Sequence, residues 1–369
     1  MSIAKELKIC VYTITKNEEQ FAKKWAENMS EADYTVVLDT GSTDKTVEIL
    51  KAEGVTVEVK PIIPWRFDVA RNESMKLIPE DVDICVCTDL DELFEPGWAD
   101  AIRKHWKSDT EKLKYLFSWS HDEDGNSKVQ IWYEKIHDNT GNWYWAMPIH
   151  EAITHKTKRL DEVITEIVPG EEMHLHHYPD LSKSRGNYLE LMELALQEEP
   201  ENITQHWYYG RELFFHQRYE DAVNQFERLK TLGNGGFQYQ RAGALVFLGH
   251  SYFNLGNIQG AEINYILSTL IGNDVRDPYI QLAHFYYSQN RWYACIDTCL
   301  KALEIDKMKV EWYENSHNYK ELPHDYLSIA YYNIGDFVRS LEQINIALAY
   351  SPADKRLLSN KEITLKAIE

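Results

Sequence analysis

Residues 8–15 read KICVYTIT and residues 34–39 read YTVVLD, two short runs rich in β-branched and apolar residues. Residues 55–60 (VTVEVK) and 83–88 (DICVCT) are runs of the same kind. Between the first two, Phe21, Trp25 and Met29 recur every fourth residue, the spacing of one face of a helix. Strands that alternate with helices of about ten residues predict a parallel sheet with helices on both faces. Largely apolar strands agree, because both of their faces would be covered.

Two further patterns complete this half of the chain. Residues 41–44 (GSTD) predict a turn that caps a helix over residues 45–52. Residues 114–180 differ, with short aromatic-rich strands expected over 115–120, 129–136 and 143–147, separated by polar turns. We interpret this stretch as an antiparallel appendage to the parallel sheet.

The second half of the chain is predicted to be helical and repetitive. Four segments align on a small residue early in a helix, and they begin at Arg218, Asn257, Arg291 and Asp336, which are 39, 34 and 45 residues apart. The middle spacing is the tetratricopeptide period. Small residues at these points, and at Gly210 in an upstream helix, would let paired helices approach closely. We therefore predict two domains, 1–180 and 181–369.

Composition limits the class of protein. The 369 residues are 44% hydrophobic and 27% charged, as in globular proteins, and the net charge is −20. An acidic chain repels phosphate backbones, so nucleic acid is not the expected partner. The sequence has no run of 18 apolar residues, and residues 1–8 lack the apolar core of a signal peptide. The five cysteines lie mostly in apolar runs, so a soluble cytoplasmic protein with reduced thiols and no membrane span is expected.

Polar residues follow the predicted strands where each one ends. In an open parallel sheet, ligands bind beyond the carboxyl ends of the strands. Carboxylates crowded there repel one another unless a cation compensates them, and oxygen ligands suit Mg²⁺ or Mn²⁺. The residues concerned are Thr13, Thr15, Asn17, Glu18, Asp39, Thr40, Asp89, Asp91 and Glu92.

Four blocks occur in order along the first half: residues 15–19 (TKNEE), 36–44 (VVLDTGSTD), 67–74 (FDVARNES) and 89–92 (DLDE). The set resembles family-2 glycosyltransferases of the GT-A fold, whose hallmark blocks are KNEE, DTGSTD, ARN and DxDE. Residues 149–151 (IHE) and 176–178 (HHY) are similar to blocks of a subgroup with C-terminal tetratricopeptide helices. The resemblance covers essentially the whole chain. It implies an α/β, Rossmann-like GT-A domain, with a mostly parallel sheet and an antiparallel appendage, followed by an all-α repeat domain.

The same resemblance implies an activity and roles for residues. The activity is metal-dependent, inverting transfer of a sugar from a nucleoside diphosphate donor, uridine-linked, with Mn²⁺ or Mg²⁺. Asp39 would accept a hydrogen bond from the base, and Thr13 and Glu18 would line the uridine pocket. Arg71 would lie near the base and diphosphate, and Asp89 would hold the ribose or support its loop. Asp91 would bind the metal that bridges the diphosphate.

The catalytic base and a late metal ligand are less defined. Inversion needs a carboxylate or a histidine within reach of the acceptor, and Glu151, Asp122 and Asp124 are the candidates, with Glu151 favoured. The family's acidic pair in this region has no clear equivalent here. The alternative is that Glu151 pairs with a basic residue such as Lys156 or Arg159.

Residues 173–177 (MHLHH) are predicted to form a strand with His177 on one face and with His174 and His176 on the other. The family block favours His177 as a metal ligand. The alternative is that all three histidines are hydrogen-bonded structural groups.

Two classes of function remain open at this point. The repeats would offer a concave surface to a protein or peptide acceptor, or to a second copy in a homodimer. The alternative to an enzyme is a catalytically inactive scaffold that binds proteins through these repeats. A phosphatase of the haloacid dehalogenase type is discounted, because Leu93 stands where that motif needs Thr or Val.

Overall fold

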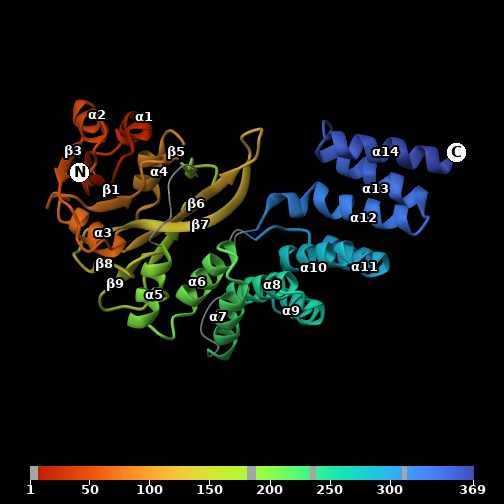
Figure 1. Cartoon of the computed structure of the whole chain (residues 1–369). Coiled ribbons are helices and arrows are strands. Elements are labelled where there is room, and N and C mark those ends of the chain that lie inside the picture. The colour runs from red at the N-terminus through yellow and green to blue at the C-terminus, as the bar shows by residue number, and fades with distance from the viewer. Residues whose placement is uncertain (1–6, 181–187, 233–237, 310–313) are drawn as a thin grey trace. The chain divides into compact units, whose positions relative to one another are not determined.

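The computed structural model describes residues 7–180, 188–232, 238–309 and 314–369 (Figure 1). The chain forms two compact units, residues 1–195 and 196–369. The sequence places the boundary earlier, at 180. Helix α5 (Tyr188–Glu198) begins within the first unit, where the ring of Tyr188 makes edge contacts with Phe67 and His150.

The first unit is built on one large sheet. Its strand order is β3-β2-β1-β4-β7-β6-β11-β5, and β10 also pairs with β6. The four strands expected from the sequence, β1 to β4, are parallel neighbours. The strands of this sheet are β1 (Ile9–Thr15), β2 (Tyr34–Asp39), β3 (Thr56–Val59), β4 (Ile84–Cys87), β5 (Glu92–Phe94), β6 (Lys112–His121), β7 (Ser127–Asp138), β10 (Thr165–Ile167) and β11 (His174–His177).

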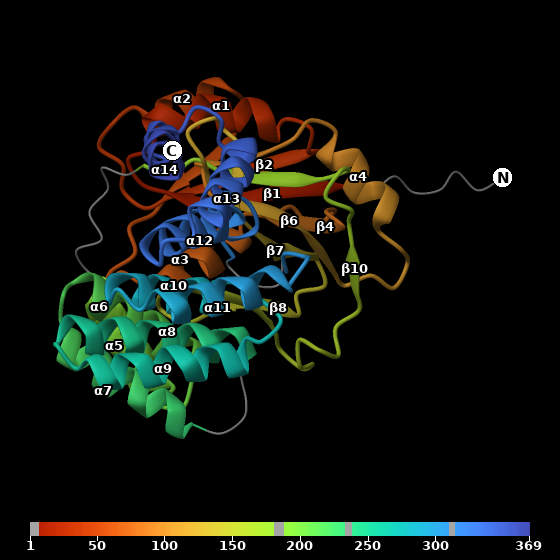
Figure 2. The same ribbon diagram turned by 90° about the vertical axis from the view of Figure 1, so that its right-hand side faces the viewer.

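Helices cover both faces of the parallel strands. Helices α1 (Glu19–Met29) and α2 (Thr46–Ala52) lie on one side and α3 (Phe67–Met75) on the other (Figures 1 and 2). Strand β1 is buried along nearly its whole length. On the α3 side, Cys10 and Tyr12 pack with Trp143 and Trp145. This confirms that the apolar strands are covered twice. A fourth helix, α4 (Trp98–His105), follows β5.

The aromatic segment joins the sheet. Strands β6 and β7 form an antiparallel hairpin, and β7 continues the sheet by pairing antiparallel with β4. Strand β11 lies between β6, to which it is parallel, and β5, to which it is antiparallel. The predicted strand at Trp143 belongs to a separate two-stranded sheet, β8 (Trp143–Ala146) with β9 (Ala152–His155). The antiparallel appendage is thus confirmed for β6 and β7.

The second unit consists of helices that pack in sequence order. Each helix from α6 to α13 contacts the next, and α6, α8, α10 and α12 also contact one another in turn, as stacked helix pairs do (Figure 2). This confirms the predicted helical repeats. The helices are α6 (Ile203–Phe215), α7 (Tyr219–Thr231), α8 (Gln238–Asn254), α9 (Ile258–Ile271), α10 (Asp277–Ser288), α11 (Trp292–Leu303), the 3₁₀ helix η1 (Ser316–Tyr319), α12 (Glu321–Asn333), α13 (Phe337–Tyr350) and α14 (Lys355–Ile368).

Small residues set the close packing of each pair. The four aligned residues, Ala222, Ala261, Cys295 and Ser340, are all fully buried near the starts of α7, α9, α11 and α13. In the preceding helix, a Cβ added at Gly210 would come within 2.6 Å of the Phe226 ring. No larger side chain fits there without moving the ring. Cys295 and its neighbour Cys299 are core residues, as expected.

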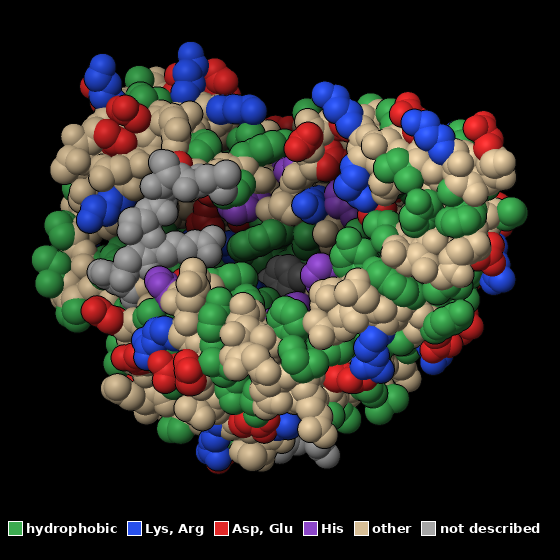
Figure 3. Space-filling model, turned by 45° about the vertical axis from the view of Figure 1, so that its right-hand side comes forward, with side chains coloured by type: hydrophobic (Ala, Val, Ile, Leu, Met, Phe, Trp, Pro, Cys, Tyr) green, Lys and Arg blue, Asp and Glu red, His purple; other side chains and the backbone are tan. Residues whose placement is uncertain are grey.

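The face drawn in Figure 3 is mixed in charge. On the face drawn in Figure 3, Lys and Arg side chains lie among Asp and Glu, and hydrophobic side chains are exposed between them. Across the described residues, no helix is both long enough and apolar enough to cross a bilayer.

Candidate functional site

The candidate site lies at the carboxyl ends of β1, β2 and β4, which are neighbours in the sheet. Thr15, the last residue of β1, is level with Asp39, the last residue of β2. Both residues are buried. Thr13 is also buried, and its hydroxyl donates to the carbonyl of Ile14. The Thr15 hydroxyl is buried and has no hydrogen-bond partner among the described residues.

Asp39 holds its own turn. Its Oδ1 accepts hydrogen bonds from the backbone N–H groups of Gly41, at 3.0 Å, and Ser42, at 2.9 Å, and its Oδ2 accepts from the Ser42 hydroxyl. Gly41 has a φ of 115°, which strains any other residue. The Asp39 side chain is fully buried. A base could reach this carboxylate only if the turn opened.

The first two sequence blocks bind each other. The Asn17 amide oxygen accepts from the N–H of Thr43 at 2.7 Å, and the Glu18 N–H donates to the Thr46 hydroxyl at 2.7 Å. Asp44 Oδ1 accepts from the N–H of Thr46 at 3.0 Å and from the Thr46 hydroxyl, but the N-cap position of α2 is Lys45, one residue later than the expected cap. These contacts place the half-buried Glu18 beside the end of β1. They also show that residues of the KNEE and GSTD blocks stabilise each other's loops.

Arg71 is the centre of the charged part of the site. It projects from α3, is 4% exposed, and donates from Nη2 to Asp89 at 2.7 Å and from Nε to Glu151. Its guanidinium also lies 5.1 Å from the centre of the Trp145 ring. One arginine therefore joins the loop after β4 to the segment between β8 and β9. The sequence alternatives for Glu151 named Lys156 and Arg159, but the basic partner in the structure is Arg71.

Asp89 has a second cation that the sequence did not indicate. Lys135 on β7 is buried and lies 3.3 Å from Asp89 and 3.7 Å from Glu92. Burial opposes ionisation of Asp89, but the charges of Arg71 and Lys135 outweigh it and hold the pKa of Asp89 well below its usual range. Asp89 is therefore an anion. Strand β7 also carries Lys128, Glu134 and His137, so nothing in its sequence singles out Lys135.

Glu92 is one of the carboxylates expected at the strand ends, although the sequence assigned it no individual role. It is 2% exposed, and its Oε2 accepts the backbone N–H of Asp89 at 2.9 Å. Burial raises the pKa of Glu92 to about 7, with Asp89 and Asp91 adding to the effect and Lys135 opposing it. Glu92 thus fixes the turn that presents Asp89 and Asp91.

Asp91 and His177 meet, although they are far apart in the sequence. Asp91 Oδ2 lies 3.3 Å from His177 Nε2, and the Asp91 carbonyl accepts the backbone N–H of Tyr178 at 2.8 Å. His177 Nδ1 is hydrogen-bonded to the Trp119 carbonyl at 3.1 Å, which leaves Nε2 toward Asp91. Burial alone would lower the pKa of His177, but the hydrogen bond and charge of Asp91 raise it.

This pair fits a metal ion. Two ligands bound to one ion at about 2.1 Å lie about 3.0–3.4 Å apart, which is the separation of Asp91 and His177. Burial of both side chains is partial, at 20% and 15% exposed, so water or a ligand can approach. The strand faces follow the prediction, because His174 and His176 turn to the opposite side of β11, toward Glu95.

Asp122 and Asp124 lie in the turn between β6 and β7. Asp122 Oδ1 accepts from the backbone N–H groups of Asp124 at 3.1 Å and Asn126 at 2.8 Å. The turn is stabilised by these bonds, and Asp124 is exposed. Of the three candidate bases, Glu151 is the one that the structure connects to Arg71 and Asp89.

Asn72 anchors the site to the small sheet. Its side chain donates to the carbonyl of Trp145 at 2.8 Å and accepts from the N–H of Trp145 at 2.9 Å. Two adjacent residues of α3 therefore have different contacts: Arg71 binds two carboxylates, and Asn72 is hydrogen-bonded to the backbone of β8. Trp145 and Trp143 are core residues, whereas Trp119 is 41% exposed.

Comparisons with known proteins give similarities over part of the chain. No protein-family model matches the chain, and no curated protein does. Among solved structures, MamA has 17% identity and a TM-score of 0.38, covering 48% of this chain and 99% of its own. YrrB, described as a TPR protein with an unusual peptide-binding site, has 14% identity and a TM-score of 0.37, covering 47% and 81%. TTC0263, a TPR protein from Thermus thermophilus, has 17% identity and a TM-score of 0.35, covering 48% and 88%.

Proposed function

We propose that this chain is a metal-dependent glycosyltransferase of the GT-A type, which moves a sugar from a nucleoside diphosphate, uridine-linked, to an acceptor with inversion. The observation that carries the proposal is the 3.3 Å approach of Asp91 Oδ2 and His177 Nε2 beyond the end of β4. The resemblance to family-2 glycosyltransferases named these two residues as ligands of one ion, and they come from distant parts of the chain.

Asp91 and His177 would hold Mn²⁺ or Mg²⁺. A mixed oxygen and nitrogen donor set favours Mn²⁺ of the two, because Mg²⁺ prefers oxygen alone. When bound, the ion supplies Lewis-acid stabilisation of charge on the departing diphosphate. His177 is oriented for this by its bond to Trp119, and Asp91 by the turn that Glu92 fixes.

Arg71 and Lys135 position the site instead of binding phosphate themselves. Both are buried, and Arg71 is occupied by two carboxylates. They keep Asp89 ionised and fixed, so that it can accept a hydrogen bond from a ribose hydroxyl. Thr15 offers a buried hydroxyl at the same edge. Asp39 and Glu18 remain the proposed residues of the uridine pocket, with opening of the 41–42 turn as a requirement for Asp39.

Glu151 is the proposed catalytic base. Arg71 binds its Oε1, so Oε2 is the oxygen through which Glu151 would accept the proton of the acceptor nucleophile. Glu151→Gln keeps the shape of the side chain, and it is expected to lower the chemical step more than donor binding. Loss of turnover only in Asp122→Asn or Asp124→Asn would assign the base to the β6–β7 turn.

The helical unit is proposed to bind the acceptor, a protein or peptide, or a second copy of the chain. Large hydrophobic side chains are exposed on it, among them Leu270 at 66%, Tyr293 at 76% and Val338 at 62%. The same feature supports the alternative function, a protein-binding scaffold without catalytic activity.

Thermal unfolding with nucleotides decides between the two functions. The chain is heated with UDP, GDP, CMP and UDP-sugars, each with Mn²⁺ and with chelator, since a ligand that binds only the folded state raises the unfolding temperature. If the chain is a glycosyltransferase, the unfolding temperature should rise only when both Mn²⁺ and a uridine nucleotide are present. Asp91→Asn should abolish this rise. Asp100→Asn, an exposed carboxylate on α4, is the matched control. No shift with any nucleotide would support the scaffold.

A further inference from the structure

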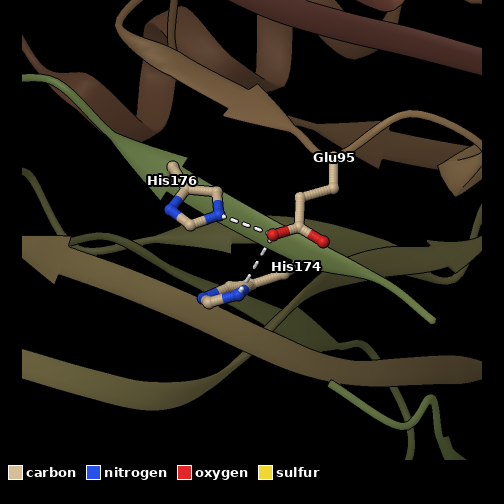
Figure 4. Close-up of side chains that lie close together, drawn as sticks. All are labelled: Glu95, His174 and His176. Atoms are coloured by element: carbon tan, nitrogen blue, oxygen red, sulfur yellow. Dashed lines mark hydrogen bonds and ion pairs between the residues drawn. The ribbon is translucent and has the colours of Figure 1, made fainter. Parts of the chain in front are cut away.

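A second group of metal-binding side chains lies on the other face of β11 from His177. Glu95 Oε1 is 3.3 Å from His176 Nε2 and 3.8 Å from His174 Nδ1, and the three ligand atoms lie within 4.8 Å of one another. Figure 4 shows the Glu95 carboxylate facing both imidazole rings, which come from β11. In the part of the chain that the structure describes, no other three His, Cys, Asp or Glu residues converge in this way.

Each imidazole is held by its far nitrogen. His174 Nε2 is hydrogen-bonded to the Ser118 hydroxyl at 2.7 Å, and that hydroxyl bonds to Ser127 at 2.6 Å. His176 Nδ1 is hydrogen-bonded to His121 Nε2 at 2.9 Å. Histidines that bind metals almost always have the second ring nitrogen fixed by such a bond, which sets the tautomer and the direction of the first. Here both near nitrogens are directed at Glu95.

The spacing and the donors select a class of ion. In a tetrahedral site with ligands at about 2.1 Å, donor atoms lie about 3.4 Å apart. The Glu95 distances bracket that value. Two imidazoles and one carboxylate suit Zn²⁺ and related transition ions, whereas Mg²⁺ and Ca²⁺ prefer oxygen. The side chains of His174 and His176 are 10% and 18% exposed, but Glu95 is 53% exposed, so an ion can enter beside it and keep a water ligand.

We propose that Glu95, His174 and His176 form a transition-metal site of the Zn²⁺ type, separate from the Asp91–His177 pair. The two sites share the β5–β11 ladder, in which His176 pairs with Leu93 and His177 with Glu92. An ion bound to Glu95 and both histidines joins the end of β5 to β11. It thereby fixes the strand from which His177 projects toward Asp91.

The test is Zn²⁺ titration of the full chain, freed of any polyhistidine tag, followed by calorimetry. Co²⁺ serves as a second probe, because its visible absorption changes when imidazole binds. The titrations use the wild type and Asp91→Asn, which removes the other proposed site. Both are expected to bind Zn²⁺ at the Glu95 site with affinities within about twofold of each other, and a second Zn²⁺ ion bound by the wild type alone would belong to the Asp91–His177 pair. The five cysteines are buried, so thiols do not compete in the folded chain.

Three variants identify the ligands. Glu95→Gln and His176→Gln are each expected to weaken Zn²⁺ binding at least about tenfold, and Ser118→Ala, which frees the far nitrogen of His174, about tenfold. His216→Gln is the matched control, because the exposed His216 pairs with the buried Glu212 and has no third ligand among the described residues. Unfolding in chelator at the wild-type temperature shows that each variant is folded.

Two results would overturn the proposal. One is a wild-type chain that binds Zn²⁺ no more tightly than Glu95→Gln or His176→Gln. The other is loss of the Zn²⁺ site in Asp91→Asn, which would assign the ion to the Asp91–His177 pair. Neither result bears on nucleotide binding with Mn²⁺, so the glycosyltransferase proposal stands or falls separately.

Discussion

Arg71→Met removes the cation that joins two carboxylates, and it is expected to destabilise the sheet-containing unit strongly. Arg71 is 4% exposed, and it binds Asp89 and Glu151. Removing one partner of a buried ion pair costs about 3–5 kcal/mol, because the other charge stays buried without compensation. Asp89 keeps Lys135 at 3.3 Å, so most of the cost falls on Glu151, whose side chain is 11% exposed.

A double-mutant cycle isolates that cost. In Arg71→Met with Glu151→Gln, the unpaired charge is gone, and about 1.5–3 kcal/mol of the loss should return, the usual value of a hydrogen bond to a charged group. Hydrogen exchange of peptides from β1 and β4, measured at increasing urea, gives the free energy of opening for this unit alone. Arg159→Met, which breaks only the exposed pair with Asp161, should change nothing measurable. Additive single effects, or a stable Arg71→Met variant, would refute the assignment.

Three further predictions concern the core and the repeats. Burial lowers the pKa of His137 to about 4, so the unfolded chain, with a pKa of about 6.5, takes up the proton first as the pH falls. The free energy of unfolding therefore falls by about 3 kcal/mol between about pH 6.5 and 4 because of this residue. In His137→Gln, the free energy of unfolding should change less with pH over this range than in the wild type. Gly210→Ala should cost about 1–2 kcal/mol, since overpacking against Phe226 exceeds the gain in helix propensity; faster exchange in α6 and α7 would report it. Asn72→Ala should cost about 2 kcal/mol and speed exchange in β8, because Trp145 loses two hydrogen bonds.

The sequence predicted those strands and helices whose own residues form a recognisable apolar run or repeat. The bounds of β2 coincide with the run 34–39, and β1 differs from its run by one residue. The small residues of the repeats were found because four short segments align, although they lie 39, 34 and 45 residues apart, and all four small residues are buried. Three-residue strands such as β5 and β10 were missed, since a run that short has no periodicity.

The sequence could not predict which strands pair with each other, or which distant side chains they bring together. Nothing local indicates that β7 lies against β4, so Lys135 could not be placed beside Asp89 and Glu92. Arg71 was recognised within its block, but the identity of its second partner, Glu151, depends on where the β8–β9 segment packs. Asp39 shows the opposite case. Its carboxylate caps the Gly41–Ser42 turn, a local bond that Asp followed by Gly and Ser could have indicated.

Strand β11 places two chemistries one residue apart. Because side chains alternate between the faces of a strand, the register of β11 against β5 and β6 decides which histidine reaches Asp91 and which reach Glu95. Inserting one residue between His176 and His177 would turn His177 to the Glu95 side and leave Asp91 without its imidazole. A substitution in β11 can therefore alter one proposed site without the other. An insertion or deletion in this strand must alter both.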